Sequence, residues 1–318
     1  MQPLLNTLSV VVPVYGNEGA IDALVDALRS IRDRCDGDFE AVFVVDGSPD
    51  RSYARLRERL PQAGFPAQLI ALSRNFGAFA AIRAGLGRAR GDAIAVMAAD
   101  LQEPPELVLR LHALVRDGAH DVAFGVRESR ADPLPGRWAS ALFWWGYRRW
   151  VMPDIPPGGV DIFAITAAFR DRLLALGEAN SSLLAQLFWL GGRRGFAGYA
   201  RQPRRHGRSA WTVRKKLRYL SDSVFAFTDL PVRLLFWLGG VALAVALALS
   251  AVTLVARLSG WVAVPGYAGT MLAILFFGAF NSLALGVVGA YAWRAFENTK
   301  GRPSSVILTE ERFGEPSP

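Results

Sequence analysis

Two side chains with oxygen donors, Asp100 and Gln102, stand at the end of an apolar run that begins near Asp92. Carboxylate and amide oxygens are hard ligands of the kind that bind Mg²⁺ or Mn²⁺. Such a cation offsets the negative charge of phosphate groups and polarises their oxygens. Asp100 and Gln102 are therefore a candidate metal site, and the alternative role of Asp100 is to cap a helix that begins near Pro105.

Arginines gather in two places that suit the binding of phosphate groups. One group follows an apolar run at 121–126, and the other directly precedes Gly207. The groups consist of Arg127 with Arg130, and of Arg201 with Arg204 and Arg205. Guanidinium groups bind phosphate oxygens in a bidentate manner, so each group is a candidate phosphate site. Taken singly, each arginine fits a solvated surface position equally well.

The elements that must position these residues alternate along the first 130 residues. Short apolar runs, typical of parallel strands that are buried on both faces, occupy 8–15, 39–46, 68–73, 92–100 and 121–126. Helical patterns lie between them at 18–34, 50–60, 78–89 and 105–117. This order predicts an α/β fold with a doubly wound sheet, whose ligands bind at the carboxyl ends of the strands. Asp46 and Asp100 end two of these strands.

The sequence after residue 230 predicts two membrane spans. Residues 234–256 contain no charged side chain, and the next charge after Arg257 is Arg294. A helix of that first length reaches about 35 Å, enough to cross a hydrocarbon core of about 30 Å. We therefore predict a domain at 1–230, spans at 232–257 and 266–293 within 231–294, and a tail at 295–318. Two buried helices of a soluble core are the alternative.

Basic residues flank these spans unequally. The net charge is +8, the stretches 201–233 and 294–302 are rich in arginine, and Arg257 is the one cation between the spans. The positive-inside rule then predicts a multi-pass protein of the cytoplasmic membrane with both termini in the cytoplasm. The stretches 137–151 and 211–229 mix aromatic and basic residues and predict helices in the membrane interface. We expect anionic lipid, not nucleic acid, as the partner of this charge.

Eight motifs in order resemble those of family 2 glycosyltransferases with a GT-A fold. The match is best to the polyprenyl-phosphate branch, which includes dolichol-phosphate mannose synthases and bacterial undecaprenyl-phosphate sugar transferases. The motifs are SVVVPVYGNEG (9–19), VVDGSPDRS (44–52), LSRNFGAFAAIRAGL (72–86), AADLQEPPE (98–106), FGVRESR (124–130), GGVDIFAIT (158–166), RQPRRHGRSAWTVRKK (201–216) and FENTKGRPSSVI (296–307). The resemblance therefore covers nearly the whole chain.

The resemblance implies inverting transfer of a sugar from a UDP- or GDP-sugar to a polyprenyl phosphate such as undecaprenyl phosphate. It also implies a homo-oligomer, for instance a tetramer, with subunit contacts through the tail at 297–307. The nucleotide-sugar would contact Pro13, Tyr15, Asn17 and Asp46, and the metal would lie on Asp100 and Gln102. Phosphate and lipid would contact Arg127, Arg130, Arg201, Arg204, Arg205 and Ser209.

Asp161 matches the family's proposed catalytic base, and with Asp100 it completes the candidate catalytic residues. Since the acceptor phosphate is already largely ionised at neutral pH, Asp161 would mainly orient the acceptor. For both Asp161 and Asp46 a local role, as a strand cap or a turn residue, is the alternative.

The chain departs from the family pattern mainly on the donor side. Val45 and Ala98 stand where relatives usually have carboxylates, Asn17 replaces a glutamate, and Ala210 replaces the lysine after Ser209. An alternative function follows, in which an inactive relative binds nucleotide or lipid at the membrane. A processive polysaccharide synthase is disfavoured, because the chain lacks a Gln-x-x-Arg-Trp motif and has too few spans for a polymer channel.

The uneven distribution of cations generates a topology prediction. A reporter fused after Pro318 should be cytoplasmic, and a reporter inserted between Leu258 and Tyr267 should be external. Fusions of alkaline phosphatase and of green fluorescent protein at both places measure this. An external Pro318 would overturn the two-span arrangement.

Overall fold

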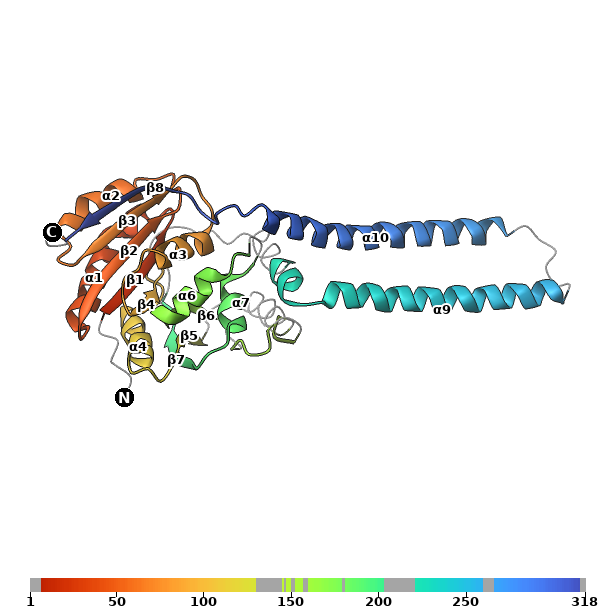
Figure 1. Cartoon of the computed structure of the whole chain (residues 1–318), viewed down its shortest axis with the longest axis horizontal. Coiled ribbons are helices and arrows are strands. Elements are labelled where there is room, and N and C mark those ends of the chain that lie inside the picture. The colour runs from red at the N-terminus through yellow and green to blue at the C-terminus, as the bar shows by residue number, and fades with distance from the viewer. Residues whose placement is uncertain are drawn as a thin grey trace.

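A computed structural model describes residues 7–129, 145, 147–149, 152–156, 160–178, 181–202, 221–259 and 266–314. The chain forms an α/β domain from which two long helices project side by side (Figure 1). The N-terminal residues of the described chain and the last strand both belong to the α/β domain, so the chain leaves this domain for the helices and then returns to it.

The α/β domain contains one eight-stranded sheet in the order β7-β5-β6-β4-β1-β2-β3-β8. The strands are β1 (Thr7–Val14), β2 (Asp38–Val45), β3 (Ala67–Leu72), β4 (Ala93–Val96), β5 (Val122–Ser129), β6 (Val160–Thr166), β7 (Arg194–Ala200) and β8 (Ile307–Phe313). The four central strands β4, β1, β2 and β3 are parallel, as predicted. The sheet as a whole is mixed, because β6 pairs antiparallel with β4 and β5, and β8 pairs antiparallel with β3.

Helices cover both faces of the central strands, which explains their continuous apolar sequences. Successive β1 residues alternate: Val10 and Val12 belong to one buried cluster and Val11 to the other. A Cβ atom on Gly85 would lie 2.4 Å from Cγ1 of Val11, so the helix that contains Gly85 can lie directly on β1. The helices and 3₁₀ turns of the domain are η1 (Glu18–Ala20), α1 (Ile21–Arg34), α2 (Ser52–Arg59), η2 (Leu60–Gln62), α3 (Ala78–Leu86), α4 (Pro105–Arg116), α6 (Ala167–Ala175) and α7 (Leu183–Trp189).

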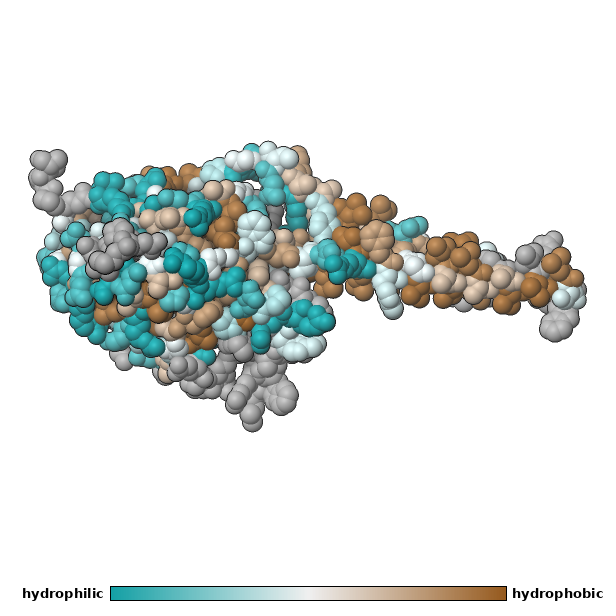
Figure 2. Space-filling view, turned by 60° about the horizontal axis from the view of Figure 1, so that its bottom comes forward, coloured by the Kyte–Doolittle hydropathy of each residue, from teal (hydrophilic) through white to brown (hydrophobic). Residues whose placement is uncertain are grey.

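The two projecting helices are α9 (Leu230–Leu258) and α10 (Tyr267–Thr299). They form a hairpin in which Gly239 lies close to the ring of Phe280. Both contain stretches long and apolar enough to cross a membrane, Leu230–Leu249 and Phe276–Thr299. Within these two stretches only Ala242, which is 8 % exposed, is buried. The surface of the hairpin is apolar along most of its length (Figure 2). The predicted spans at 232–257 and 266–293 therefore fall largely within these helices.

The predicted interfacial stretches are described only in part. Residues 147–149 and 221–227 are helical, as is Trp145. Tyr147 is 1 % exposed, and its hydroxyl donates to Oγ of Ser223 at 3.2 Å. The described part of 137–151 thus packs partly against the protein, while Trp145 remains exposed.

The base of the hairpin is joined to the segment that precedes α9. Arg294 on α10 forms an ion pair with Asp222 at 2.8 Å, and its guanidinium lies over the ring of Phe225. The rings of Phe225 and Tyr291 are 5.3 Å apart. These contacts lie where the uncharged part of α10 ends, so they set the angle at which the hairpin leaves the domain.

After α10 the chain returns to the sheet as β8, and this strand is held on both of its faces. Glu311 accepts from the hydroxyl of Tyr53 at 2.5 Å and from Nε of Arg57 at 2.9 Å, both on α2. Glu310, on the opposite face, accepts from Nε of Arg88 at 2.9 Å. The tail was expected to contact another subunit; in this structure residues 307–313 complete the chain's own sheet.

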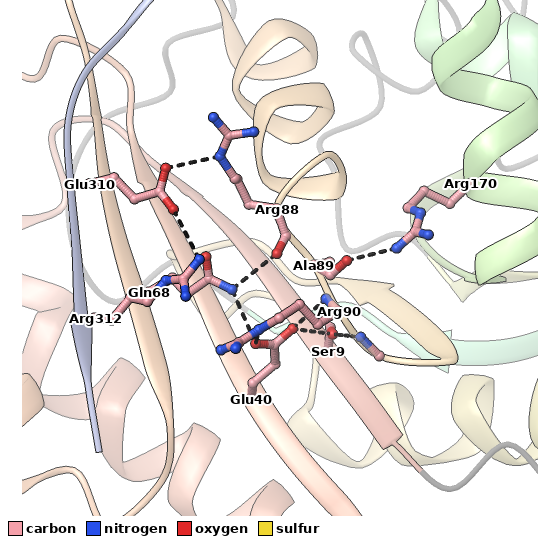
Figure 3. A network of polar contacts seen from close by, with 10 residues as sticks. Ser9, Glu40, Gln68, Arg88, Ala89, Arg90, Arg170, Glu310 and Arg312 are labelled. Atoms are coloured by element: carbon pink, nitrogen blue, oxygen red, sulfur yellow. Dashed lines mark hydrogen bonds and ion pairs between the residues drawn. The ribbon is translucent and has the colours of Figure 1, made fainter. Parts of the chain in front are cut away.

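A polar network lies beneath the amino ends of the strands (Figure 3). Glu40 on β2 is 5 % exposed and accepts from Oγ of Ser9 at 2.7 Å, from Nε2 of Gln68 at 3.1 Å and from the backbone N–H of Arg90 at 2.6 Å. Burial alone would raise the pKa of the Glu40 carboxyl, but these hydrogen bonds and the charge of Arg90 lower the pKa below its usual value. The network joins β1, β2 and β3.

Glu40→Gln should destabilise the protein at pH 7 by about 1–3 kcal/mol, because hydrogen bonds to a charged acceptor are lost. The folded-state pKa lies below the unfolded value of about 4.3, so the stabilisation is complete above that pH. It is lost as the pH falls through the folded-state pKa, where the variant and the parent should converge.

Denaturant unfolding of the detergent-solubilised protein between pH 3 and pH 8 measures this difference. Glu58→Gln is the control, since the Glu58 side chain is 57 % exposed and its ion pairs with Arg51 and Arg55 are long, at 3.9 and 4.0 Å. A pH-independent effect of Glu40→Gln would contradict the charge-based account.

Candidate functional site at the carboxyl edge of the sheet

The candidate site lies at the edge of the sheet where the parallel strands end. Val14 pairs with Val45 at the ends of β1 and β2, and Val11 pairs with Val96 at the end of β4. Strand β8 runs in the opposite direction and begins at Ile307 opposite Leu72, the last residue of β3. The chain therefore returns from the hairpin at the same edge that carries Asp46 and Asp100 (Figure 1).

The loop after β1 is bound to the loop after β2 through Asp50. The Asp50 carboxylate accepts from Oγ of Ser48 at 2.6 Å and from the backbone N–H groups of Glu18 and Ser52 at 3.0 and 3.1 Å. Burial would raise the pKa of Asp50, but these hydrogen bonds lower the pKa below its usual value. Asp50 therefore remains ionised and fixes the position of the loop that carries Tyr15.

Tyr15 and Asn17 occupy different positions in this loop. Tyr15 is 42 % exposed, which leaves its ring accessible to a ligand. The Asn17 side chain instead accepts from the backbone N–H of Tyr15 at 3.0 Å. Pro13 is half-buried within β1. The sequence interpretation assigned all three to the nucleotide-sugar and missed Ser48 and Asp50; the signal was the Ser-Pro-Asp sequence directly after the Asp46-Gly47 turn.

Asp46 binds backbone groups of the loop after β3. It is 2 % exposed, and its two carboxylate oxygens accept from the N–H groups of Phe76 at 2.7 Å and Gly77 at 2.8 Å. The loop after β2 and the loop after β3 are in close contact here. A Cβ atom on Gly47, which has φ +56°, would lie 2.3 Å from the carbonyl carbon of Arg74. Asp46 thus supports the floor of the predicted nucleotide pocket, and its predicted contact with nucleotide stays a prediction.

Asp100 and Gln102 form the two ends of a tight turn after β4. Leu101 between them has φ +53°, which is uncommon for a residue other than glycine, and the N–H of Gln102 donates to Oδ1 of Asp100 at 3.3 Å. Asp100 is half-buried and Gln102 is buried. Oε1 of Gln102 accepts from Nη2 of Arg201 at 2.6 Å. The strained turn therefore lies beside one of the predicted phosphate-binding arginines.

The oxygen donors of this turn suit Mg²⁺ or Mn²⁺ in type but are few in number. Asp100 offers a carboxylate and Gln102 an amide oxygen, which are hard ligands. Among the residues that the structure describes, no three His, Cys, Asp or Glu side chains are placed to hold a metal ion together. A cation here would need further oxygens, and the phosphates of a bound ligand are the natural source.

The remaining predicted residues are placed in part. Arg127 on β5 pairs with Tyr199 on β7, two residues before Arg201. Because β6 is antiparallel to β4, the backbone of Asp161 at the start of β6 lies at the same edge as Asp100. The side chain of Asp161 lies outside the described part of the structure. So do Arg130, Arg204, Arg205 and Ser209.

Comparison with known proteins defines the class. Residues 9–174 match the family described as glycosyl transferase family 2. The chain belongs to this family, as its motifs predicted. It is 31 % identical over 301 residues to an uncharacterized glycosyltransferase of Synechocystis, covering 94 % of each chain. It is 30 % identical over 316 residues to an undecaprenyl-phosphate 4-deoxy-4-formamido-L-arabinose transferase of Pseudomonas paraeruginosa, covering 95 % of this chain and 90 % of that protein.

Among solved structures, the chain aligns with glucosyl-3-phosphoglycerate synthase from Mycobacterium tuberculosis. The TM-score is 0.47 at 16 % identity, and the alignment covers 69 % of this chain and 80 % of that chain.

Asp46→Asn should loosen the loop after β3, because one of the two partly buried N–H groups loses its acceptor at a cost of about 1–3 kcal/mol. Hydrogen exchange of the Phe76 and Gly77 amides should become faster, and the melting temperature should fall. Asp36→Asn is the control, since the side chain of Asp36 is 90 % exposed. Unchanged exchange at Phe76 and Gly77 would show that Asp46 does not hold this loop.

Proposed function

We propose that this protein transfers a sugar from a nucleotide-sugar to a polyprenyl phosphate at the membrane surface. The observation that carries the proposal is the position of the site: the carboxyl edge of a family 2 sheet faces the base of an apolar helical hairpin. A lipid-linked acceptor keeps its phosphate at the headgroup level, where such an edge can meet it. Similarity to undecaprenyl-phosphate transferases supports the same acceptor.

On the donor side, the nucleotide would lie over the loops that Asp46 and Asp50 hold together, with the exposed ring of Tyr15 beside it. A divalent cation on Asp100 and Gln102 would neutralise the diphosphate as the nucleotide leaves. UDP- and GDP-sugars are the donors that the sequence resemblance implies.

On the acceptor side, Arg127 lies on β5 and Arg201 directly follows the neighbouring strand β7, and Arg130, Arg204, Arg205 and Ser209 are close to them in sequence. The guanidinium groups of the arginines, with the hydroxyl of Ser209, would hold the lipid phosphate. Asp161, at the same edge, would orient the acceptor so that its oxygen attacks the anomeric carbon opposite the diphosphate. An in-line attack inverts the configuration at that carbon.

The membrane arrangement belongs to the same proposal. Both termini and the α/β domain would lie in the cytoplasm, with the loop between α9 and α10 outside. The ion pairs of Asp229 with Arg233 and of Asp222 with Arg294 would then lie near the inner headgroups, below the uncharged parts of the two helices. A homo-oligomer is part of this proposal, in which the tail at 297–307 would contact another subunit while β8 pairs with β3 in its own sheet.

One observation favours a second function, in which the protein binds nucleotide or lipid without transferring sugar. Ala98 stands where relatives usually have a carboxylate, and Oε1 of Gln102 accepts a hydrogen bond from Arg201. A site with one carboxylate binds a hard cation less tightly than a site with two. The experiments below distinguish the two functions.

Purified protein should be incubated with undecaprenyl phosphate, Mn²⁺ or Mg²⁺, and a panel of UDP- and GDP-sugars. Mass spectrometry should detect one lipid-linked sugar, and undecaprenol, which lacks the phosphate, should give none. Binding of nucleotide without any product across the panel would favour the second function.

Sugar transfer should require relatively high Mg²⁺ or Mn²⁺, because Asp100 is the one carboxylate in the turn. Asp100→Asn should remove most transfer without unfolding the protein. Ala98→Asp should lower the metal concentration that gives half the maximal rate. Initial rates across a metal titration measure both effects, and full activity in the presence of a chelator would refute the metal assignment.

A further inference from the structure

Arg201 bridges the two residues that follow Leu101. Its Nη2 donates to Oε1 of Gln102 at 2.6 Å, and its Nε lies 4.0 Å from Oε1 of Glu103. Glu103 is 3 % exposed, whereas the side chain of Arg201 is 34 % exposed. The guanidinium thus contacts two buried side chains, Gln102 and Glu103, while the Arg201 side chain remains partly exposed.

The backbone joins the same two segments. The N–H of Gln202 donates to the carbonyl oxygen of Gln102 at 2.9 Å, and Nε2 of Gln102 lies 3.4 Å from the carbonyl oxygen of Gln202. The end of β7 is therefore bound to the turn after β4. Strand β7 continues directly into the sequence that contains Arg204 and Arg205, so a change at Gln102 acts at the start of the predicted lipid-phosphate segment.

A cation and Arg201 would compete for one oxygen. Oε1 of Gln102 is the atom of this side chain that can bind a divalent ion, and it already accepts a hydrogen bond from a positive group. Two positive charges on one amide oxygen repel each other. Phosphate oxygens are the stronger acceptors for guanidinium, since they carry charge and allow a bidentate contact.

We propose that Arg201 is a positioning residue that occupies Gln102 until a phosphate group draws its guanidinium away, so that phosphate binding and cation binding at the turn reinforce each other. The phosphate belongs either to the lipid acceptor or to the donor diphosphate, and in this respect the inference rests on the proposed function. The coupling would keep the affinity of the turn for a cation low until a phosphate-bearing ligand is bound. By linkage, the cation must strengthen phosphate binding by the same factor.

The first test measures Mn²⁺ binding alone. Full-length protein in nanodiscs of phosphatidylcholine is titrated with Mn²⁺ and followed by electron paramagnetic resonance, with no nucleotide or polyprenyl lipid present. Arg201→Met should bind Mn²⁺ more tightly than the parent, by about fivefold or more, because the competing cation is gone. Unchanged or weaker binding would overturn the proposal, since a purely structural role of Arg201 predicts a loss.

Arg110→Met is the matched control. Arg110 also contacts the end region of β7, where its Nη1 donates to the carbonyl oxygen of Gly198 at 2.8 Å. Arg110→Met should leave the Mn²⁺ affinity unchanged. If it raised the affinity as much as Arg201→Met does, the loss of one positive charge would explain both results, and the proposal would be overturned. Arg201→Gln replaces Arg201→Met if circular dichroism shows that the latter is unfolded.

The second test measures the coupling and its source. Undecaprenyl phosphate in the nanodiscs, or UDP in solution with its own chelation of Mn²⁺ subtracted, should tighten Mn²⁺ binding to the parent by about fivefold or more. Arg201→Met should make that gain smaller, because only the part that comes from direct contact between Mn²⁺ and phosphate remains. The arm in which the gain falls identifies lipid or donor phosphate as the ligand of Arg201. An equal gain in the variant would overturn the coupling. Neither test requires sugar transfer, so a protein without transferase activity would refute the proposed function and leave these results interpretable.

Discussion

The pairing of β8 with β3 is the interaction on which the arrangement of this protein depends. Through this pairing the chain, which leaves the sheet for the apolar hairpin, returns to the sheet. Strand β8 begins beside the end of β3, at the edge where the candidate site lies. Glu310 and Glu311 hold β8 from opposite faces through Arg88 and through Tyr53 with Arg57. Because the strand is held at both faces, the hairpin and the site edge keep a defined relation, which the proposed transfer from a nucleotide-sugar to a lipid acceptor would need.

Carboxylates near the site serve mainly to hold loops in position. Asp46 and Asp50 each accept backbone N–H groups from a neighbouring loop, and both are at least partly buried. Ionised acceptors give stronger hydrogen bonds than neutral ones, so short loops become rigid without regular secondary structure. A nucleotide would meet a preformed surface and lose less free energy to ordering the protein. The absence of a carboxylate at Val45 leaves this support intact, since Asp46 alone binds both N–H groups.

Charge balance at the turn after β4 distinguishes this chain from the pattern its family resemblance implies. With Ala98 in place of a carboxylate, the negative side chains near the turn are Asp100 and the buried Glu103. Arg201 lies between Gln102 and Glu103 and supplies positive charge without any bound ion. A buried carboxylate requires a compensating partner, and the arginine provides one that can also bind phosphate. In the function proposed here, Arg201 would therefore be a second source of positive charge for a diphosphate besides a divalent cation.

The amino-acid sequence by itself determined the alternation of strands and helices, the two long apolar helices and the family. These features follow from local periodicity, from length and from short motifs. The sequence placed Asp100 at the end of a strand over 92–100, whereas β4 ends at Val96 and Asp100 lies in the turn that follows. Only the tertiary structure decided that β6 runs antiparallel within the sheet, that β8 returns to its own sheet, and that Arg201 binds Gln102. Each of these contacts joins residues that are far apart in the chain. A pattern of apolar or charged residues indicates whether a segment is buried or exposed, but it does not indicate which distant segment it contacts. Asp46 shows the same limit: its type and place predicted a ligand contact, whereas the fold brought two backbone N–H groups to its carboxylate.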